Sequence, residues 1–161
     1  MYHVLETKYG GIRSGFHAEG PPDRCKDYTF FSVCRNPYTR VVSAFASYDR
    51  SQLIWKGGPD TFNEWIRFWI NGQHTPFLLQ TQSSRHDKFE HIDYIFPVEN
   101  LIEEISWVTC FNWFDETELP RLHPKSSIQP NLPPLDNETR AVVESYYNED
   151  FERFGYEKES E

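Results

Sequence analysis

The sequence predicts an α/β fold with a short, mainly parallel sheet flanked by helices. Two apolar runs have the length of buried strands, and stretches with helical spacing of apolar residues alternate with them along the chain. The length of 161 residues suits one domain with a core of its own. Because no internal repeat or linker is visible, we expect a single domain over residues 1–161, with a loop-rich segment at 1–26 and a core at 27–156.

The first predicted strand runs from Tyr28 to Cys34, a β-branched and aromatic run that follows a loop rich in Gly and Pro. Asn36 and Pro37 interrupt it. Pro37 suits the first position of a helix, because the N–H that proline lacks would have no partner there. We therefore expect a sharp turn and then a helix that continues through Tyr48, with the strand central in the sheet.

A second helix is predicted to begin at a capping box formed by Thr61 and Glu64. Its apolar residues fall on several sides, which predicts wide burial. The second predicted strand is His91–Phe96, which Pro97 ends, and a helix follows over about residues 98–108. Strands that alternate with helices in this way are typical of parallel sheets.

The C-terminal part is predicted to be helical. A loop with Pro and Ser covers residues 121–134. Asp136 can cap a helix over residues 137–147, because its carboxylate can accept backbone N–H groups of the first turn. One more helical turn is expected at residues 150–154.

Composition excludes several classes of function. The formal net charge of −9 disfavours nonspecific nucleic-acid binding, and no apolar run approaches the roughly 18 residues of a membrane-spanning helix. The cysteines Cys25, Cys34 and Cys110 have neither disulfide nor metal-type spacing. We therefore expect no nucleic-acid partner, no metal and no transmembrane segment, and a reducing compartment, the cytoplasm.

Charge is spread unevenly along the chain. Residues 1–50 hold seven basic and five acidic residues, whereas the remainder holds nine basic and twenty acidic ones. A bound anion is therefore expected near the N-terminal third.

The segment Phe30–Tyr48 joins the features of an anion site: a buried strand that ends at Arg35, a turn and a helix. Ligands of open α/β sheets bind at the carboxyl ends of strands, and a helix N-terminus offers N–H groups with partial positive charge. Arg35 can bind a phosphate through two parallel hydrogen bonds. On the helix, Arg40, Ser43 and Ser47 form one polar stripe. The alternative is a surface Arg35 and a tolerated small Ser43, and spacing alone leaves both interpretations open.

The stretch Phe31–Ala44, in full FSVCRNPYTRVVSA, resembles the 3'-phosphate-binding motif of sulfotransferases that use 3'-phosphoadenosine 5'-phosphosulfate (PAPS), especially the carbohydrate sulfotransferase branch. In that motif an apolar strand leads to Arg-Asn-Pro, an aromatic residue, any residue, Arg, two apolar residues and Ser. The resemblance implies a P-loop-like sulfotransferase fold in which Arg35 and Ser43 bind the 3'-phosphate. So many matched residues in one window are far more specific than a lone glycine pattern.

Weaker matches follow in the family's order, so that the resemblance covers about residues 28–156. Phe96–Leu101 is similar to the family's apolar strand with Glu-Asn-Leu, and Asp150–Tyr156 is similar to its C-terminal ending. Gln82 stands where many relatives have a Gln that lies toward the acceptor, which implies substrate binding.

The loop Leu122–Ser127 lies where relatives place a loop over the 3'-phosphate. This position implies that Lys125 and Ser127 also bind the nucleotide. The alternative is an exposed loop with an ordinary lysine.

The resemblance implies in-line transfer of a sulfuryl group from PAPS to a hydroxyl or amine, with no metal. Catalysis would come from positioning and from charge stabilisation at the leaving phosphate. His17 is the candidate catalytic base, because many relatives have a His shortly before the Arg-Asn-Pro strand. The alternative is a solvated loop histidine. An acidic chain is a poor partner for a heavily sulfated polysaccharide, so the expected acceptor is a neutral glycan or a small hydroxyl compound.

One element of the family is missing from this sequence. Relatives bind the 5'-phosphosulfate with a strand-loop-helix upstream of the Arg-Asn-Pro motif, and its Lys stabilises the leaving phosphate. The Gly-rich stretch Lys8–Gly15 does not match it. We therefore expect the chain to begin after this element, with an N-terminally incomplete sheet and with nucleotide binding stronger than turnover.

Three functions stay open: a PAPS-dependent sulfotransferase, a noncatalytic module that binds adenosine 3',5'-bisphosphate or another anion, and an interaction domain with exposed aromatic residues. Nucleotide binding separates the third from the others, and sulfate transfer separates the first from the second. The aromatic residues concerned are Trp55, Trp65, Trp69, Trp107 and Trp113.

Overall fold

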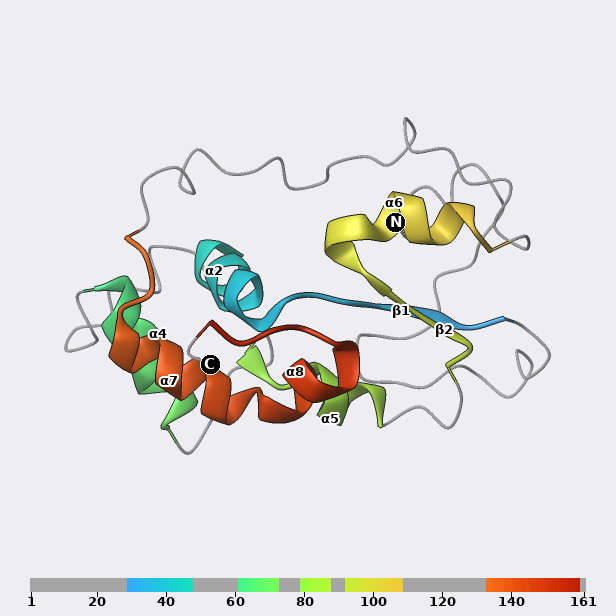
Figure 1. The fold of residues 1–161 in the computed structure, drawn as a ribbon. Coiled ribbons are helices and arrows are strands. Elements are labelled where there is room, and N and C mark those ends of the chain that lie inside the picture. The colour runs from blue at the N-terminus through green and yellow to red at the C-terminus, as the bar shows by residue number, and fades with distance from the viewer. Residues whose placement is uncertain (1–28, 48–60, 73–78, 88–91, 109–132, 160–161) are drawn as a thin grey trace. The chain divides into compact units, whose positions relative to one another are not determined.

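The structure is a computed structural model that describes residues 29–47, 61–72, 79–87, 92–108 and 133–159. Within these ranges helices separate two strands along the chain and the two strands are parallel, so the predicted α/β fold is confirmed (Figure 1). The chain divides into two compact units. The first comprises Met1–Cys34 and Arg85–Pro124, and the second comprises Arg35–Ser84 and Lys125–Glu161.

The first unit contains the sheet. Strand β1 (Phe31–Cys34) pairs in parallel and without a bulge with strand β2 (Tyr94–Pro97). The positions at which the two strands were predicted to begin lie outside the described residues. The Asp93 carboxylate accepts the Phe30 N–H at 2.7 Å, so a side chain replaces a strand partner just before the pairing starts.

Beyond β2 the chain forms a 3-10 turn, η3 (Val98–Asn100), and helix α6 (Leu101–Ser106). A single helix to about residue 108 was predicted, and the structure begins instead with the tighter turn that is common at helix N-termini. Phe96 and Ile105 are buried and form a hydrophobic cluster in the described part of this unit. The ring of Phe31 packs against that of Phe96, with 6.0 Å between the ring centroids.

The second unit is helical in the part that the structure describes. The helices that enclose its core are α2 (Pro37–Ser47), α4 (Phe62–Ile70), α7 (Asn137–Tyr146) and α8 (Asn148–Phe154). Helix α2 contacts both α4 and α7, and α4 contacts α7. The helices predicted after Asn36 and after Asp136 are therefore confirmed, and the predicted last turn begins earlier, at Asn148.

Aromatic side chains form much of the core of the second unit. The ring of Phe45 lies edge-on to the rings of Phe62 and Trp65, at 4.9 and 5.1 Å. The buried members of this core are Tyr38, Val41, Ala44, Phe62, Trp65, Ile66, Ile70, Leu79, Val143, Tyr147 and Phe151.

The described tryptophans differ in their exposure. Trp65 is only 2% exposed, which agrees with the wide burial predicted for this helix and not with the exposed position that the interaction-domain alternative gives it. Trp107 is 77% exposed, and Trp69 is partly buried. Trp55 and Trp113 lie outside the described residues. Trp65 is therefore not available for the surface that the interaction-domain alternative requires.

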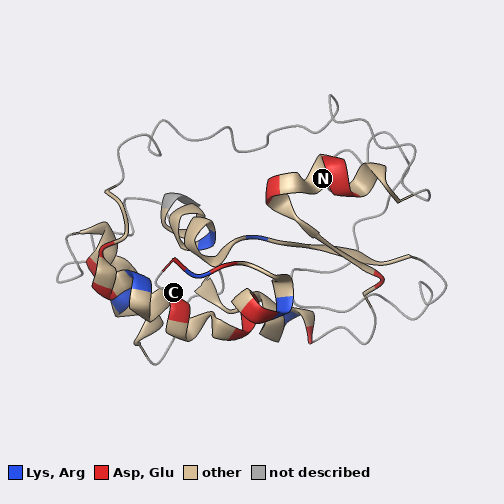
Figure 2. Cartoon of the chain, in the orientation of Figure 1, with Lys and Arg blue, Asp and Glu red and all other residues tan. Residues whose placement is uncertain are grey.

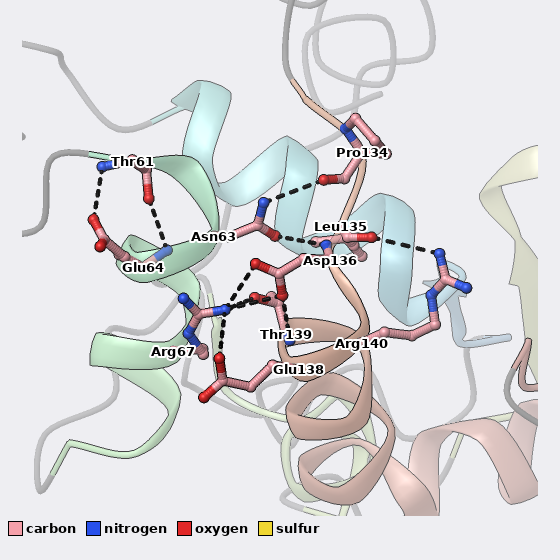
Figure 3. Close-up of polar contacts among 10 residues, drawn as sticks. All are labelled: Thr61, Asn63, Glu64, Arg67, Pro134, Leu135, Asp136, Glu138, Thr139 and Arg140. Carbon is pink, nitrogen blue, oxygen red and sulfur yellow. Dashed lines mark hydrogen bonds and ion pairs between the residues drawn. The ribbon is translucent and has the colours of Figure 1, made fainter.

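Polar contacts connect α4 to the segment that leads into α7 (Figure 3). Thr61 and Glu64 form the predicted capping box at the start of α4. Arg67 donates to the Asp136 carboxylate at 2.9 Å, while Asp136 accepts the Thr139 N–H at 2.7 Å. These bonds, the Thr139 N–H first, lower the pKa of Asp136. Asp136 is thus the N-cap that the sequence predicts, and it also holds two helices together.

Among the helices that the structure describes, none combines the length and apolar character of a membrane span.

Candidate functional site

The site begins at the turn between β1 and α2. Asn36 is the N-cap of α2: its side-chain oxygen accepts the Tyr38 N–H at 2.9 Å, and its carbonyl accepts the Arg40 N–H at 2.9 Å. Pro37 fills the first helical position, as predicted. The Arg-Asn-Pro sequence therefore ends a strand, caps a helix and starts it within three residues.

Arg35 is the residue just before this cap, and its backbone is held by Gln82. The Arg35 N–H donates to Gln82 Oε1 at 2.8 Å, and Gln82 Nε2 donates to the Arg35 carbonyl at 2.8 Å. Gln82 is only 4% exposed, whereas Arg35 is partly exposed. One amide side chain thus binds both backbone polar groups of the residue that the sequence analysis assigns to the 3'-phosphate.

Gln82 is the first residue of the short helix α5 (Gln82–His86), and Asp150 of α8 caps that helix. The fully buried Asp150 carboxylate accepts the backbone N–H groups of Gln82 at 2.7 Å and Ser83 at 2.8 Å. Its Oδ2 also lies 3.5 Å from Gln82 Nε2. Thr81 Oγ1 accepts the next N–H, that of Ser84, at 3.3 Å. An isolated helix of this length would not be stable, so α5 depends on these side chains.

Arg40 of α2 contacts the segment that leads into α5. Its Nη2 donates to the Gln80 carbonyl at 2.8 Å, and burial lowers the pKa of its guanidinium, while Tyr147 and Asp150 act in the opposite direction. An arginine stays protonated in proteins, so Arg40 provides a positive charge near the buried Asp150 carboxylate. In the predicted polar stripe on α2, Arg40 therefore serves to hold the Gln80 carbonyl.

Tyr147 is a further buried polar residue near Gln82, Asp150 and Arg40. Its hydroxyl donates to the Leu79 carbonyl at 2.6 Å, and burial raises the pKa of its phenol. Leu79 precedes α5 by three residues, so this bond fixes the approach of the chain to Gln82.

A second buried contact ties α2 to the C-terminal part of the chain. The Tyr38 hydroxyl donates to Glu144 Oε1 and accepts the Glu159 N–H at 3.0 Å. Burial, and then the Glu144 carboxylate, raises the pKa of Tyr38 to about 12. Arg140 forms an ion pair with Glu159 at 3.3 Å. The segment after α8 is thus attached to the N-terminal turn of α2.

Charge on these helices is also uneven. Arg40 is the only charged residue of α2, whereas α7 and α8 carry several carboxylates (Figure 2). Arg35 lies just before α2, so the charged residues of this segment itself are basic, while the carboxylates of Glu144 and Asp150 lie close to it from α7 and α8. Within the described ranges, His, Cys, Asp and Glu form no group of three or more that could hold a metal ion.

The structure brings some of the predicted site residues together. Arg35 and Gln82 are in contact, and Ser43 lies partly buried on α2, two turns after the cap. The contacts of Gln82 are to Arg35 and Asp150, and its predicted contact with an acceptor stays a prediction. The other predicted residues lie outside the described residues: His17, Lys125 and Ser127.

Sequence reasoning missed the role of Asp150. It lies in the segment Asp150–Tyr156, where the sequence analysis noted a weak match and predicted a helical turn. Its carboxylate binds N–H groups 67 and 68 residues away in sequence, and no local pattern signals such a contact.

Comparison with known proteins agrees with the motif. A model of the sulfotransferase family matches residues 13–157, most of the chain. Comparisons with curated proteins and with solved structures found no match.

Proposed function

Because the chain belongs to the sulfotransferase family, we propose that it transfers a sulfuryl group from PAPS to a hydroxyl-bearing acceptor. The observation that carries the proposal is the turn at Arg35, where a strand ends, a capped helix begins and a partly exposed guanidinium has its backbone fixed. The same turn carries the Arg-Asn-Pro motif. We propose one sulfotransferase domain over residues 1–161, with a nucleotide-binding core at 27–156.

In this proposal Arg35 and Ser43 hold the 3'-phosphate. A guanidinium can donate two parallel hydrogen bonds to a phosphate, and the N-terminus of α2 adds partial positive charge. The partly exposed guanidinium of Arg35 is the cationic group that supports an anion at this position. Lys125 and Ser127 are proposed as further ligands of the same phosphate.

Transfer is proposed to be in line. The acceptor oxygen forms a bond to sulfur while the bond between sulfur and the bridging phosphate oxygen breaks, and adenosine 3',5'-bisphosphate leaves. The acceptor proton passes to His17, the proposed base. Positioning of the donor and the acceptor would contribute to the rate, and no residue of this chain is assigned to charge stabilisation at the leaving phosphate.

The proposed acceptor is a neutral glycan or a small hydroxyl compound. The formal net charge of −9 would repel a heavily sulfated polysaccharide. An acceptor panel that includes both neutral and sulfated sugars would test this charge preference.

The decisive first experiment is calorimetric titration of adenosine 3',5'-bisphosphate into the wild-type chain and Arg35→Ala. Loss of the guanidinium should weaken binding by about 2–4 kcal/mol, because a phosphate loses its bidentate partner. Arg153→Ala is the matched control, since it removes one exposed positive charge, which forms an ion pair with Glu149 at 3.9 Å within α8.

Equal affinity of wild type and Arg35→Ala would refute the site. Transfer of radiolabelled sulfate from PAPS to the acceptor panel then tests catalysis, with His17→Ala as the inactive control. Nucleotide binding without any transfer would indicate a binding module in place of an enzyme.

A further inference from the structure

We infer that Gln82 and Asp150 are positioning residues that hold Arg35 in the geometry that a 3'-phosphate requires, an inference that rests on the proposed function. The two residues act in series: Asp150 holds Gln82, and Gln82 holds Arg35. Neither side chain needs to touch the nucleotide for this role.

The first link is the amide of Gln82. It accepts the Arg35 N–H and donates to the Arg35 carbonyl, both at 2.8 Å. Pairing of β1 with β2 ends at Cys34, so among the described residues the Gln82 amide provides at Arg35 the two bonds that a neighbouring strand would have made. With both backbone groups held, the direction in which the Arg35 side chain leaves the backbone is restricted.

The second link is the carboxylate of Asp150. It holds the backbone N–H of Gln82 at 2.7 Å and lies 3.5 Å from Gln82 Nε2, so it orients both the backbone and the side chain of the same residue. Because the carboxylate accepts, the amide nitrogen of Gln82 faces Asp150 and Arg35 O, and the amide oxygen faces the Arg35 N–H. The orientation of the amide is therefore set by its partners on both sides.

Burying the side chains of Gln82 and Asp150 costs free energy that apolar side chains at these positions would not cost. Gln82 is 4% exposed and Asp150 is fully buried, and a buried carboxylate is unfavourable unless it is hydrogen bonded and compensated. The Asp150 carboxylate is hydrogen bonded to the N–H groups of Gln82 and Ser83, at 2.7 and 2.8 Å. Every hydrogen bond described for the two side chains ends at the first turn of α5 or at the backbone of Arg35. The polar groups thus converge on the residue proposed to bind phosphate, which favours a positioning role.

The variants that test this role are Gln82→Met, which keeps the volume and removes both bonds to Arg35, and Asp150→Asn. The matched control is Asp136→Asn, another aspartate that caps a helix, whose described contacts are with α4 and α7 (Figure 3). Three quantities are measured for each: the dissociation constant of adenosine 3',5'-bisphosphate, the melting temperature, and hydrogen exchange at the Arg35 amide without nucleotide.

We expect Gln82→Met and Asp150→Asn to weaken nucleotide binding on the order of tenfold, the effect of losing one or two hydrogen bonds that position a ligand-binding group. Exchange at the Arg35 amide should become faster in both. The control Asp136→Asn should lower the melting temperature while its dissociation constant and Arg35 exchange stay at wild-type values. Should Asp150→Asn fail to fold, Gln82→Met alone decides the test.

A double-mutant comparison separates positioning from general destabilisation. In the Arg35→Ala background, Gln82→Met should cause no further loss of affinity, because it acts through the Arg35 side chain. Equal losses with and without that side chain, or wild-type affinity in Gln82→Met, would overturn this inference alone. Absence of nucleotide binding by the wild-type chain would overturn the proposed function and the inference with it.

Discussion

Several residues near the Arg35 turn are both polar and buried. Tyr38 is 8% exposed and donates to Glu144, which is also 8% exposed. Asp150 is fully buried with Arg40 nearby. Each such group requires its partner, because an unsatisfied buried polar atom costs about 1–3 kcal/mol. Substitutions here are therefore expected to have larger effects than most surface changes.

Tyr38 predicts a dependence of stability on alkaline pH. The folded protein raises the pKa of its phenol from 10.0 to about 12, so the folded state binds this proton more tightly than the unfolded state. Its contribution to the free energy of unfolding is complete below about pH 10 and is lost as the pH rises toward about 12. Urea unfolding across this range should show the loss, and Tyr38→Phe should make the curve flatter.

Tyr147→Phe is the comparison for that experiment. Burial also raises the pKa of Tyr147, so this variant should flatten the curve as well. A wild-type curve that does not fall between about pH 10 and about pH 12 would contradict the burial of both phenols.

At the scale of elements, the second unit uses short helices whose ends are fixed by side chains. Helix α4 has a capping box, α7 has Asp136, α2 has Asn36, and α5 has Thr81 with the distant Asp150. Helix α8 ends at Gly155, whose φ of 70° is in the left-handed region that favours glycine. Short helices are marginal alone, so these caps decide where each begins and ends.

The capping box of α4 gives an element-scale prediction. Thr61→Ala removes the side-chain oxygen that accepts the Glu64 N–H at 3.3 Å and should lower the free energy of unfolding by about 1 kcal/mol. Thr61→Ser keeps an acceptor and should stay close to wild type. Chemical denaturation measures both, and equal losses in the two variants would show that the hydroxyl is not the stabilising group.

The lower free energy of unfolding of Thr61→Ala should not be accompanied by a lower affinity for nucleotide. Thr61 and Glu64 contact each other and have no described contact with Arg35 or Gln82. Calorimetry on Thr61→Ala should therefore return the wild-type dissociation constant.

At the scale of the whole molecule, the proposed ligand residues and the residues that position them belong to one compact unit. Arg35, Ser43, Gln82 and Asp150 all lie within Arg35–Ser84 and Lys125–Glu161. The C-terminal helix α8 contributes Asp150 and the core residue Phe151, so loss of this helix should affect both binding and stability.

Nucleotide binding should stabilise the folded chain as a whole. A ligand that binds only the folded state at about a hundredfold excess over its dissociation constant adds about 2.7 kcal/mol, which raises the melting temperature. Adenosine 3',5'-bisphosphate should therefore raise the melting temperature of the wild type, and 5'-AMP, which lacks the 3'-phosphate, should raise it much less. A similar shift from both nucleotides would place the recognition outside the 3'-phosphate.

The rise in melting temperature that adenosine 3',5'-bisphosphate causes should depend on Arg35. At the same nucleotide concentration, an affinity weakened by about 2–4 kcal/mol leaves Arg35→Ala less than about 1 kcal/mol of stabilisation, so its melting temperature should rise much less than that of the wild type. This readout needs no acceptor and no turnover.

Much of this protein could be predicted from local sequence, because local interactions decide those features. Thr61 with Glu64, Asn36 with Pro37, and Asp136 each act within one helical turn, so the sequence alone located the starts of three helices. The apolar runs around Val33 and Ile95 predicted two strands, and their alternation with helices predicted the parallel pairing. The Arg-Asn-Pro motif likewise identified the family.

Only the tertiary structure decided which residues support Arg35. Gln82 and Asp150 reach their partners across 47 and 67 residues of chain, and such contacts leave no periodic signal in sequence. The sequence predicted wide burial for α4 but not the partner of Trp65, whose ring lies 5.1 Å from that of Phe45 on α2. Local chemistry thus determined where helices and strands begin, while packing between distant segments determined which polar side chains surround the site.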